Sequence, residues 1–112
     1  MASLKPINQI ISESDVLINN ALSDEAISTE LALFGYDETK LNEGKALLDE
    51  VIELNRKQEK EKGKAESATM ERNLKINELL ECTGELREVA KIALEENEQW
   101  LEKLGILARS DA

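Results

Sequence analysis

The side chains that could carry chemistry are few, and the chain contains no histidine. Histidine is the commonest general base and metal ligand in proteins, and it activates the nucleophile of Ser-His and Cys-His pairs. Di-iron sites in helical bundles also need Glu-x-x-His motifs, which cannot exist here. We therefore expect no catalytic residue, no cofactor-binding residue, no metal-binding residue and no cofactor. The protein is predicted not to be an enzyme.

Carboxylates and one thiol are the remaining candidates. Glu95, Glu96 and Glu98 could bind calcium or magnesium weakly, but they lack the Asp-rich loop with a turn glycine that builds a dedicated site. We interpret them as a solvated helix start. Cys82 lies near the apolar face of its predicted helix, where a free thiol usually behaves as a small buried hydrophobe, and a reactive thiol is the alternative.

The only basic segment, residues 56–64, has five Lys or Arg residues interleaved with glutamates, and it contains no aromatic residue for base stacking. The whole chain carries a net charge of −10, with a pI near 4.5. Nucleic acid and anionic membranes repel such a surface, so we predict neither as a partner. The basic segment is interpreted as a solvated helix tip. It could also dock on an acidic partner or on acidic segments of another copy.

The elements that would position these residues are helices. Hydrophobic residues make up 41% of the chain and charged residues 34%, with only five Gly and one Pro, which is typical of an all-α protein. The apolar residues recur at the spacing of one helical face. One domain, 1–112, is predicted to form an antiparallel helical bundle, with its exposed hairpin tip near Gly63. Three longer helices are expected at about 4–22, 37–62 and 65–95, and two short corner helices at about 24–34 and 97–104.

Two short segments resemble each other, "ALSDEAISTELALFGY" (21–36) and "ALEENEQWLEKLGI" (93–106). Each starts with Ala-Leu, passes through acidic residues and ends with a glycine between two hydrophobic residues. A glycine can take the left-handed conformation that turns its neighbours inward. We interpret both ends as packed corners, and the alternative is a small ligand pocket under the first, with the Tyr36 hydroxyl as its polar group. The predicted corner residues are Phe34, Gly35, Tyr36, Trp100, Leu104, Gly105 and Ile106.

The two long helices extend past what the first helix can cover, so some of their apolar residues would remain in water unless a second copy covered them. An antiparallel two-fold dimer would also bring the basic segment opposite acidic segments such as residues 37–53. We therefore predict a homodimer. The predicted interface residues are Leu47, Leu48, Val51, Leu54, Leu74 and Ile76.

The chain has one cysteine, and its start, "MASLKPINQI", has no long apolar stretch of the signal-peptide kind. We expect a bacterial-type cytoplasmic protein. The stretch "LFGYDETKLNEGKALLDEV", followed by "KGKAESAT" and "AKIALEENEQWLEKLGI", resembles uncharacterised bacterial helical-bundle proteins that share a Phe/Leu-Gly-Tyr corner and a Leu-x-x-Gly-x-x-Leu-Leu helix. That resemblance implies a helical fold and brings no ligand or activity.

These observations predict a small non-enzymatic helical protein that acts through protein–protein contacts, most simply as a homo-oligomer. A small-ligand or metal-responsive binding module, with its pocket beneath the Phe34-Gly35-Tyr36 corner, is the alternative. An apolar groove along the two long helices would favour a protein partner. A closed pocket with convergent polar groups would favour a ligand.

Overall fold

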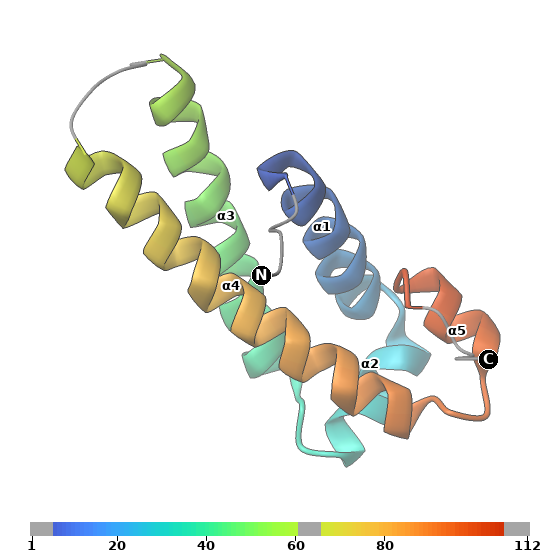
Figure 1. The fold of residues 1–112 in the computed structure, drawn as a ribbon. Helices are drawn as coiled ribbons and strands as arrows, with labels where there is room; N and C mark the ends of the chain where they lie inside the picture. Colours follow the sequence, from blue (N-terminus) through green and yellow to red (C-terminus); the bar gives the residue numbers. More distant parts are fainter. Residues whose placement is uncertain (1–5, 61–65, 107–112) are drawn as a thin grey trace.

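The computed structural model describes residues 6–60 and 66–106, and these residues form five helices (Figure 1). The helices are α1 (Ile7–Ser23), α2 (Glu25–Leu33), α3 (Glu38–Lys60), α4 (Glu66–Ala93) and α5 (Glu98–Lys103). The predicted all-α helical bundle is confirmed. The predicted helices match the observed ones in number and order, and each predicted start precedes the observed one by one to three residues. The predicted hairpin tip at Gly63 lies outside the described residues.

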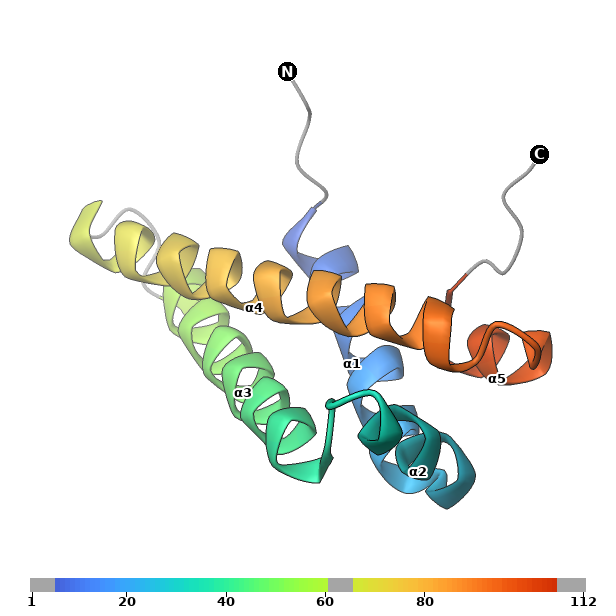
Figure 2. The ribbon, with the colours of Figure 1, turned by 90° about the horizontal axis from the view of Figure 1, so that it is seen from below.

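The two longest helices, α3 and α4, pack side by side, and α1 packs mainly against α3 (Figures 1 and 2). They have 23 and 28 residues, whereas α1 has 17. At about 1.5 Å per residue, α4 is therefore far longer than α1. The distal ends of α3 and α4 extend past α1, so α1 leaves part of both helices uncovered (Figure 1).

Aspartates start α2 and α3. The Asp24 carboxylate accepts hydrogen bonds from the backbone N–H groups of Ala26 and Ile27, at 3.1 and 3.3 Å. The Asp37 side chain accepts a hydrogen bond from the backbone N–H of Lys40 at 3.1 Å. Ser23 is the last residue of α1, so Asp24 both ends α1 and caps α2, and the chain turns without a loop.

One hydrophobic cluster holds all five helices together. Leu48 and Val51 belong to this core, at 1% and 0% exposed, and therefore offer no surface to a second copy. Their assignment to an interface is corrected: the helical spacing identifies them as apolar, but it does not show that neighbouring helices of the same chain cover them. The largest fully buried side chains are Leu17, Ile18, Ile27, Leu31, Leu41, Leu48, Leu79, Leu86, Leu94, Leu104, Val51 and Thr83.

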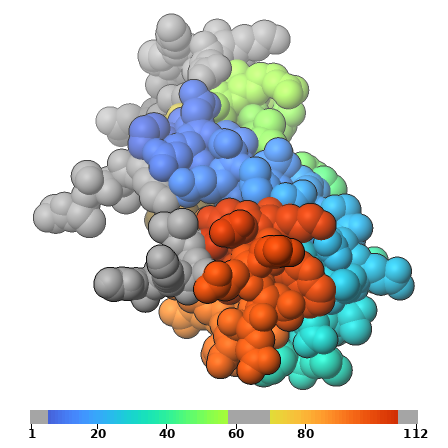
Figure 3. Space-filling view, turned by 90° about the vertical axis from the view of Figure 1, so that its right-hand side faces the viewer, coloured from blue at the N-terminus to red at the C-terminus, as the bar shows by residue number. Residues whose placement is uncertain are grey.

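The short helix α5 closes one end of the bundle, next to α1 and α2 (Figure 3). Asn20 of α1 donates its side-chain N–H to the carbonyl oxygen of Lys103 at 2.7 Å. The Lys103 ammonium in turn pairs with the Asp24 carboxylate at 2.5 Å. Trp100 is half-buried against the core. These contacts tie the last helix to the junction of the first two.

Candidate functional site

The two predicted corners share one backbone geometry. At the first, Gly35 has φ +88°, and the N–H groups of Gly35 and Tyr36 donate to the carbonyls of Ala32 and Leu31, both at 3.0 Å. At the second, Gly105 has φ +80° and the equivalent pair of hydrogen bonds forms at 2.9 Å. Both are Schellman motifs, in which a left-handed residue satisfies the last carbonyls of a helix. The sequence resemblance between the two segments thus corresponds to a common turn.

The side chains of the two corners differ in burial. Tyr36 is 3% exposed, whereas Phe34 is 51% exposed, so the expectation that both neighbours of Gly35 turn inward is wrong for Phe34. Phe34 occupies the C-cap position before the turn, and the reversal at Gly35 directs the following residue into the core. At the second corner both Leu104 and Ile106 are buried.

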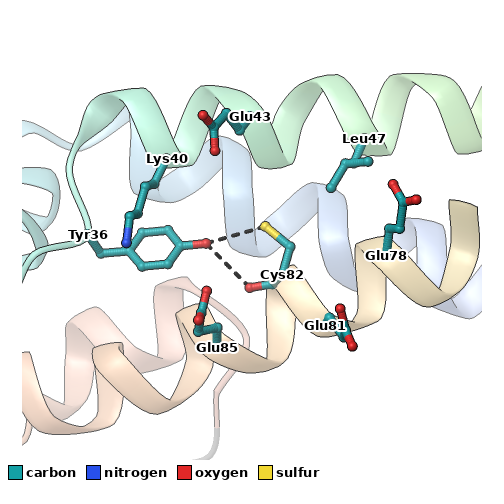
Figure 4. Close-up of a pocket in the computed structure, with 8 residues that line it drawn as sticks. All are labelled: Tyr36, Lys40, Glu43, Leu47, Glu78, Glu81, Cys82 and Glu85. Atoms are coloured by element: carbon teal, nitrogen blue, oxygen red, sulfur yellow. Dashed lines mark hydrogen bonds between the residues drawn. The ribbon is translucent and has the colours of Figure 1, made fainter.

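Beneath the first corner, the Tyr36 ring lies against Cys82 of α4 (Figure 4). Its hydroxyl donates to the Cys82 carbonyl oxygen at 3.4 Å and lies 3.3 Å from the Cys82 sulfur. The Lys40 ammonium sits 5.6 Å from the centre of the ring, within cation–π range. Burial, reinforced by the hydrogen bond with Cys82, raises the pKa of the Tyr36 phenol above its ordinary value. The phenol therefore stays protonated, and its hydroxyl is already engaged within the chain.

Next to this pair runs a cleft of about 480 Å³ between α3 and α4 (Figure 4). The alternative interpretation of the sequence expects a ligand pocket beneath the Phe34-Gly35-Tyr36 corner, and of these three residues Tyr36 lines the cleft. Its lining is acidic, with four glutamates against one lysine, and Leu47 is the one aliphatic side chain in it. Such a lining favours a cation over an apolar or anionic ligand. The lining residues are Tyr36, Lys40, Glu43, Leu47, Glu78, Glu81, Cys82 and Glu85.

The cluster Glu95, Glu96 and Glu98 lies at the turn between α4 and α5, where all three side chains are exposed. Asn97 occupies the N-cap position of α5, but its side chain makes no capping hydrogen bond, contrary to expectation. Within the described part of the chain, no group of three or more Asp, Glu or Cys side chains is placed to hold a metal ion. The turn is a solvated acidic surface.

A second cleft, of about 380 Å³, lies between α1 and α4 and was not predicted from the sequence. Ile7 and Ile10 of α1 face Ile76 and Leu80 of α4 across it, and Arg72, Asn73 and Asn77 complete its lining. The residues from α4 recur every three or four positions, so they share one helical face. That pattern is visible in the sequence, but nothing in it shows that α1 is the neighbour.

The predicted interface residues separate into three groups. Leu48 and Val51 are core residues, as described above, while Leu47, Leu54 and Ile76 are half-buried. Leu74 is 60% exposed, and Met70, which was not predicted, is 62% exposed one turn before it. Met70 and Leu74 are thus exposed apolar side chains one turn apart on α4.

No protein-family model, curated protein or solved structure matches the chain. Its function is therefore argued from its own geometry. In residues 6–60 and 66–106, no helix combines the length and the apolar character that crossing a membrane requires.

Proposed function

We propose that this protein is a small non-enzymatic helical module that acts through protein–protein contacts and pairs with a second copy of itself. One observation carries the proposal: Met70 and Leu74, both on α4, are exposed by 62% and 60%. Residues four apart on a helix are neighbours on one face. Together, Met70 and Leu74 form a small exposed apolar surface, which we call the α4 patch.

The energetics favour covering the α4 patch. Burying a side chain of this size is favourable by roughly 1.5–3 kcal/mol, and a two-fold interface uses the same patch on both copies. Its polar surroundings resemble an interface rim. Lys75 pairs with Glu50 of α3 at 3.2 Å and with Glu78 at 3.4 Å. The hydrogen bond that Lys75 donates to Glu50 is the main reason that the pKa of Lys75 is raised. Lys75 therefore stays charged beside the patch.

The proposal also includes a bacterial cytoplasmic location and excludes nucleic acid and membranes as partners. The net charge of −10 supports the exclusion, because it opposes binding to polyanions.

Light scattering coupled to size exclusion tests the dimer. At tens of micromolar we expect twice the protomer mass of 12.5 kDa. Leu74→Glu should return the protein to the protomer mass, because it places a charge in the centre of the paired patch. Leu33→Glu is the matched control: Leu33 is 72% exposed on α2 and should tolerate the same change without loss of the dimer. A wild-type mass of 12.5 kDa at this concentration would contradict the proposal.

The second candidate is binding of a small organic cation in the cleft beneath the Phe34-Gly35-Tyr36 corner. The acidic lining of that cleft favours it, and the engaged Tyr36 hydroxyl weighs against it. Titration with the diamine putrescine decides: a saturable rise in Tm that Glu81→Gln removes would favour the ligand. For the metal-responsive form, a stoichiometric Tm rise with calcium, magnesium, zinc or iron would be needed, and we expect little change because the described residues hold no ligand cluster.

A further inference from the structure

Arg72 is the charged side chain of the α1–α4 cleft, and its hydrogen bonding is incomplete. Its Nη1 donates to the Oδ1 of Asn55 on α3 at 3.2 Å. Its Nε is buried and has no hydrogen-bond partner, the one such side-chain nitrogen or oxygen among the residues that the structure describes. A buried N–H of a charged group without an acceptor is strongly unfavourable, so such atoms are rare in folded proteins. No described residue therefore fills the remaining hydrogen-bonding capacity of the Arg72 guanidinium.

The engaged atom defines what kind of acceptor fits. With Nη1 on Asn55, Nε belongs to the side edge of the guanidinium. That edge presents two parallel N–H groups and matches the two oxygens of a carboxylate. A neutral carbonyl would leave the positive charge uncompensated.

The walls of the cleft define the remainder of the ligand. Ile7 and Ile10 on one side and Ile76 and Leu80 on the other are aliphatic, and the volume of about 380 Å³ is that of a small-molecule site. Asn73 and Asn77 add neutral amides. A ligand with an aliphatic chain and one acidic end would place its chain between the aliphatic walls and its acidic end against Arg72.

The charge of the cleft separates it from the rest of the surface. The lining of the Tyr36–Cys82 cleft includes four glutamates, and the turn before α5 has three, yet no acidic residue lines the α1–α4 cleft. On a chain with 24 acidic residues and a net charge of −10, this is a cleft with a cation and apolar walls. It admits an anion that the Tyr36–Cys82 cleft and the turn before α5 repel.

We propose that the cleft between α1 and α4 binds a free aliphatic carboxylate, of the medium-chain fatty acid class, with the carboxylate paired to Arg72 and the chain lying between the isoleucines. This site is separate from the α4 patch. Ile76 and Leu80 face α1, whereas Leu74 is exposed on the outer surface of the same helix. The proposal therefore does not depend on the dimer.

Calorimetric titration with octanoate, below its micelle-forming concentration, tests the proposal on the full chain. We expect saturable binding of one octanoate per protomer, both in the wild type and in the Leu74→Glu variant. Octanol has the same chain without the charge and should bind at least about tenfold more weakly, because the charge-assisted pair is lost. No saturable octanoate binding, or equal binding of octanol, would overturn the proposal.

Substitution of Arg72 provides the second arm. Arg72→Gln should weaken octanoate binding by at least about tenfold, and Arg72→Lys, which keeps the charge but loses the paired N–H edge, should restore it only in part. Arg56→Gln is the matched control, because Arg56 is an exposed arginine that pairs with Glu53 away from the cleft. Equal binding by Arg72→Gln and Arg56→Gln would overturn the proposal.

A measurement without substitution covers the case in which Arg72→Gln does not fold. In the NMR spectrum of the wild type, the Arg72 Nε–H resonance should shift on addition of octanoate and stay in place on addition of octanol. If the resonance does not respond to octanoate, the proposal is wrong. If Arg72→Gln dissociates the dimer while octanoate fails to bind, the acceptor belongs to a second copy of the chain, and the proposal is also wrong.

Discussion

Three glycines show how much a single position depends on its surroundings. Gly35 lies at φ +88° in open space, and Gly84 lies within α4, also with nothing within 4 Å of the place where a Cβ would stand. Gly44 lies in α3 at a close approach: an added Cβ would be 3.0 Å from the Cys82 sulfur and 3.3 Å from Cδ1 of Ile18. Gly35 thus allows the left-handed backbone conformation, and Gly44 allows close packing against Cys82 and Ile18. Gly44 is also the glycine of the Leu-x-x-Gly-x-x-Leu-Leu pattern, and the structure gives that pattern a physical reason.

Gly35→Val should lower the free energy of unfolding by about 1–3 kcal/mol, because a β-branched residue is strained in the left-handed region. Urea denaturation measures the change. Gly84→Ala is the control: it adds a methyl group in open space on a helix and should raise stability by about 0.5–1 kcal/mol. A neutral Gly35→Val would show that the corner does not need its left-handed turn.

Gly44→Ala should be destabilising, although alanine is the better helix former by about 1 kcal/mol. The added methyl group meets two atoms that cannot easily move: Ile18 is fully buried, and the Cys82 sulfur contacts the Tyr36 hydroxyl. Overpacking of this kind costs about 1–3 kcal/mol. A double-mutant cycle with Cys82→Ala measures the contact. We expect the second substitution to relieve part of the loss, and strictly additive effects would show that Cys82 is not the obstacle.

At the scale of elements, the ion pair between Asp24 and Lys103 connects the start of α2 to α5. The hydrogen bond from Lys103, followed by that from the Ile27 N–H, lowers the pKa of the Asp24 carboxyl below its ordinary value. A group whose pKa is lower in the folded than in the unfolded chain stabilises the fold above its unfolded pKa. That contribution is lost as the pH falls through the folded value.

Asp24→Asn should therefore lower Tm at neutral pH, and the difference from the wild type should disappear in acid, below the lowered pKa of Asp24. Asparagine caps helices as well as aspartate does, so the change isolates the ion pair from the cap. Thermal unfolding followed by circular dichroism between pH 7 and 2 measures it. Asp37→Asn is the control, since Asp37 caps α3 through the backbone N–H of Lys40 and forms no ion pair with a lysine ammonium among the described residues. A Tm difference for Asp24→Asn that is independent of pH would contradict this account.

The helices could be predicted from the sequence, but which helices pack against each other could not. Helical spacing placed all five helices, and glycines between hydrophobic residues marked both turns, because both signals are local. Which helix covers a face is a tertiary property, so the spacing could not separate the core residue Val51 from the exposed residue Leu74. The α1–α4 cleft was not predicted for the same reason: its two walls, Ile7 and Ile10 on one side and Ile76 and Leu80 on the other, lie far apart in the sequence. The exposure of Phe34 is a tertiary property too, because Leu104 occupies the same position before its turn and is buried.

At the scale of the whole molecule, shape and charge oppose each other. The molecule measures 47 × 32 × 18 Å, and its long axis leaves the distal part of α4 beyond the cover of α1. The exposure of Met70 and Leu74 favours pairing through the α4 patch. Each protomer carries a net charge of −10, however, and two such surfaces repel.

The balance between these two effects predicts how the dimer responds to salt. At low ionic strength the repulsion between protomers reaches about 30 Å, and at 0.15 M it is screened beyond about 8 Å, while burial of Met70 and Leu74 is little affected. The proportion of dimer should therefore rise with salt. Sedimentation of the wild type across a sodium chloride series measures it, with Leu74→Glu expected to remain monomeric throughout. A dimer that instead dissociates as salt is added would show that opposite charges hold it together. The interface would then pair the basic segment 56–64 with an acidic face of the partner, because only attraction between unlike charges is weakened by screening.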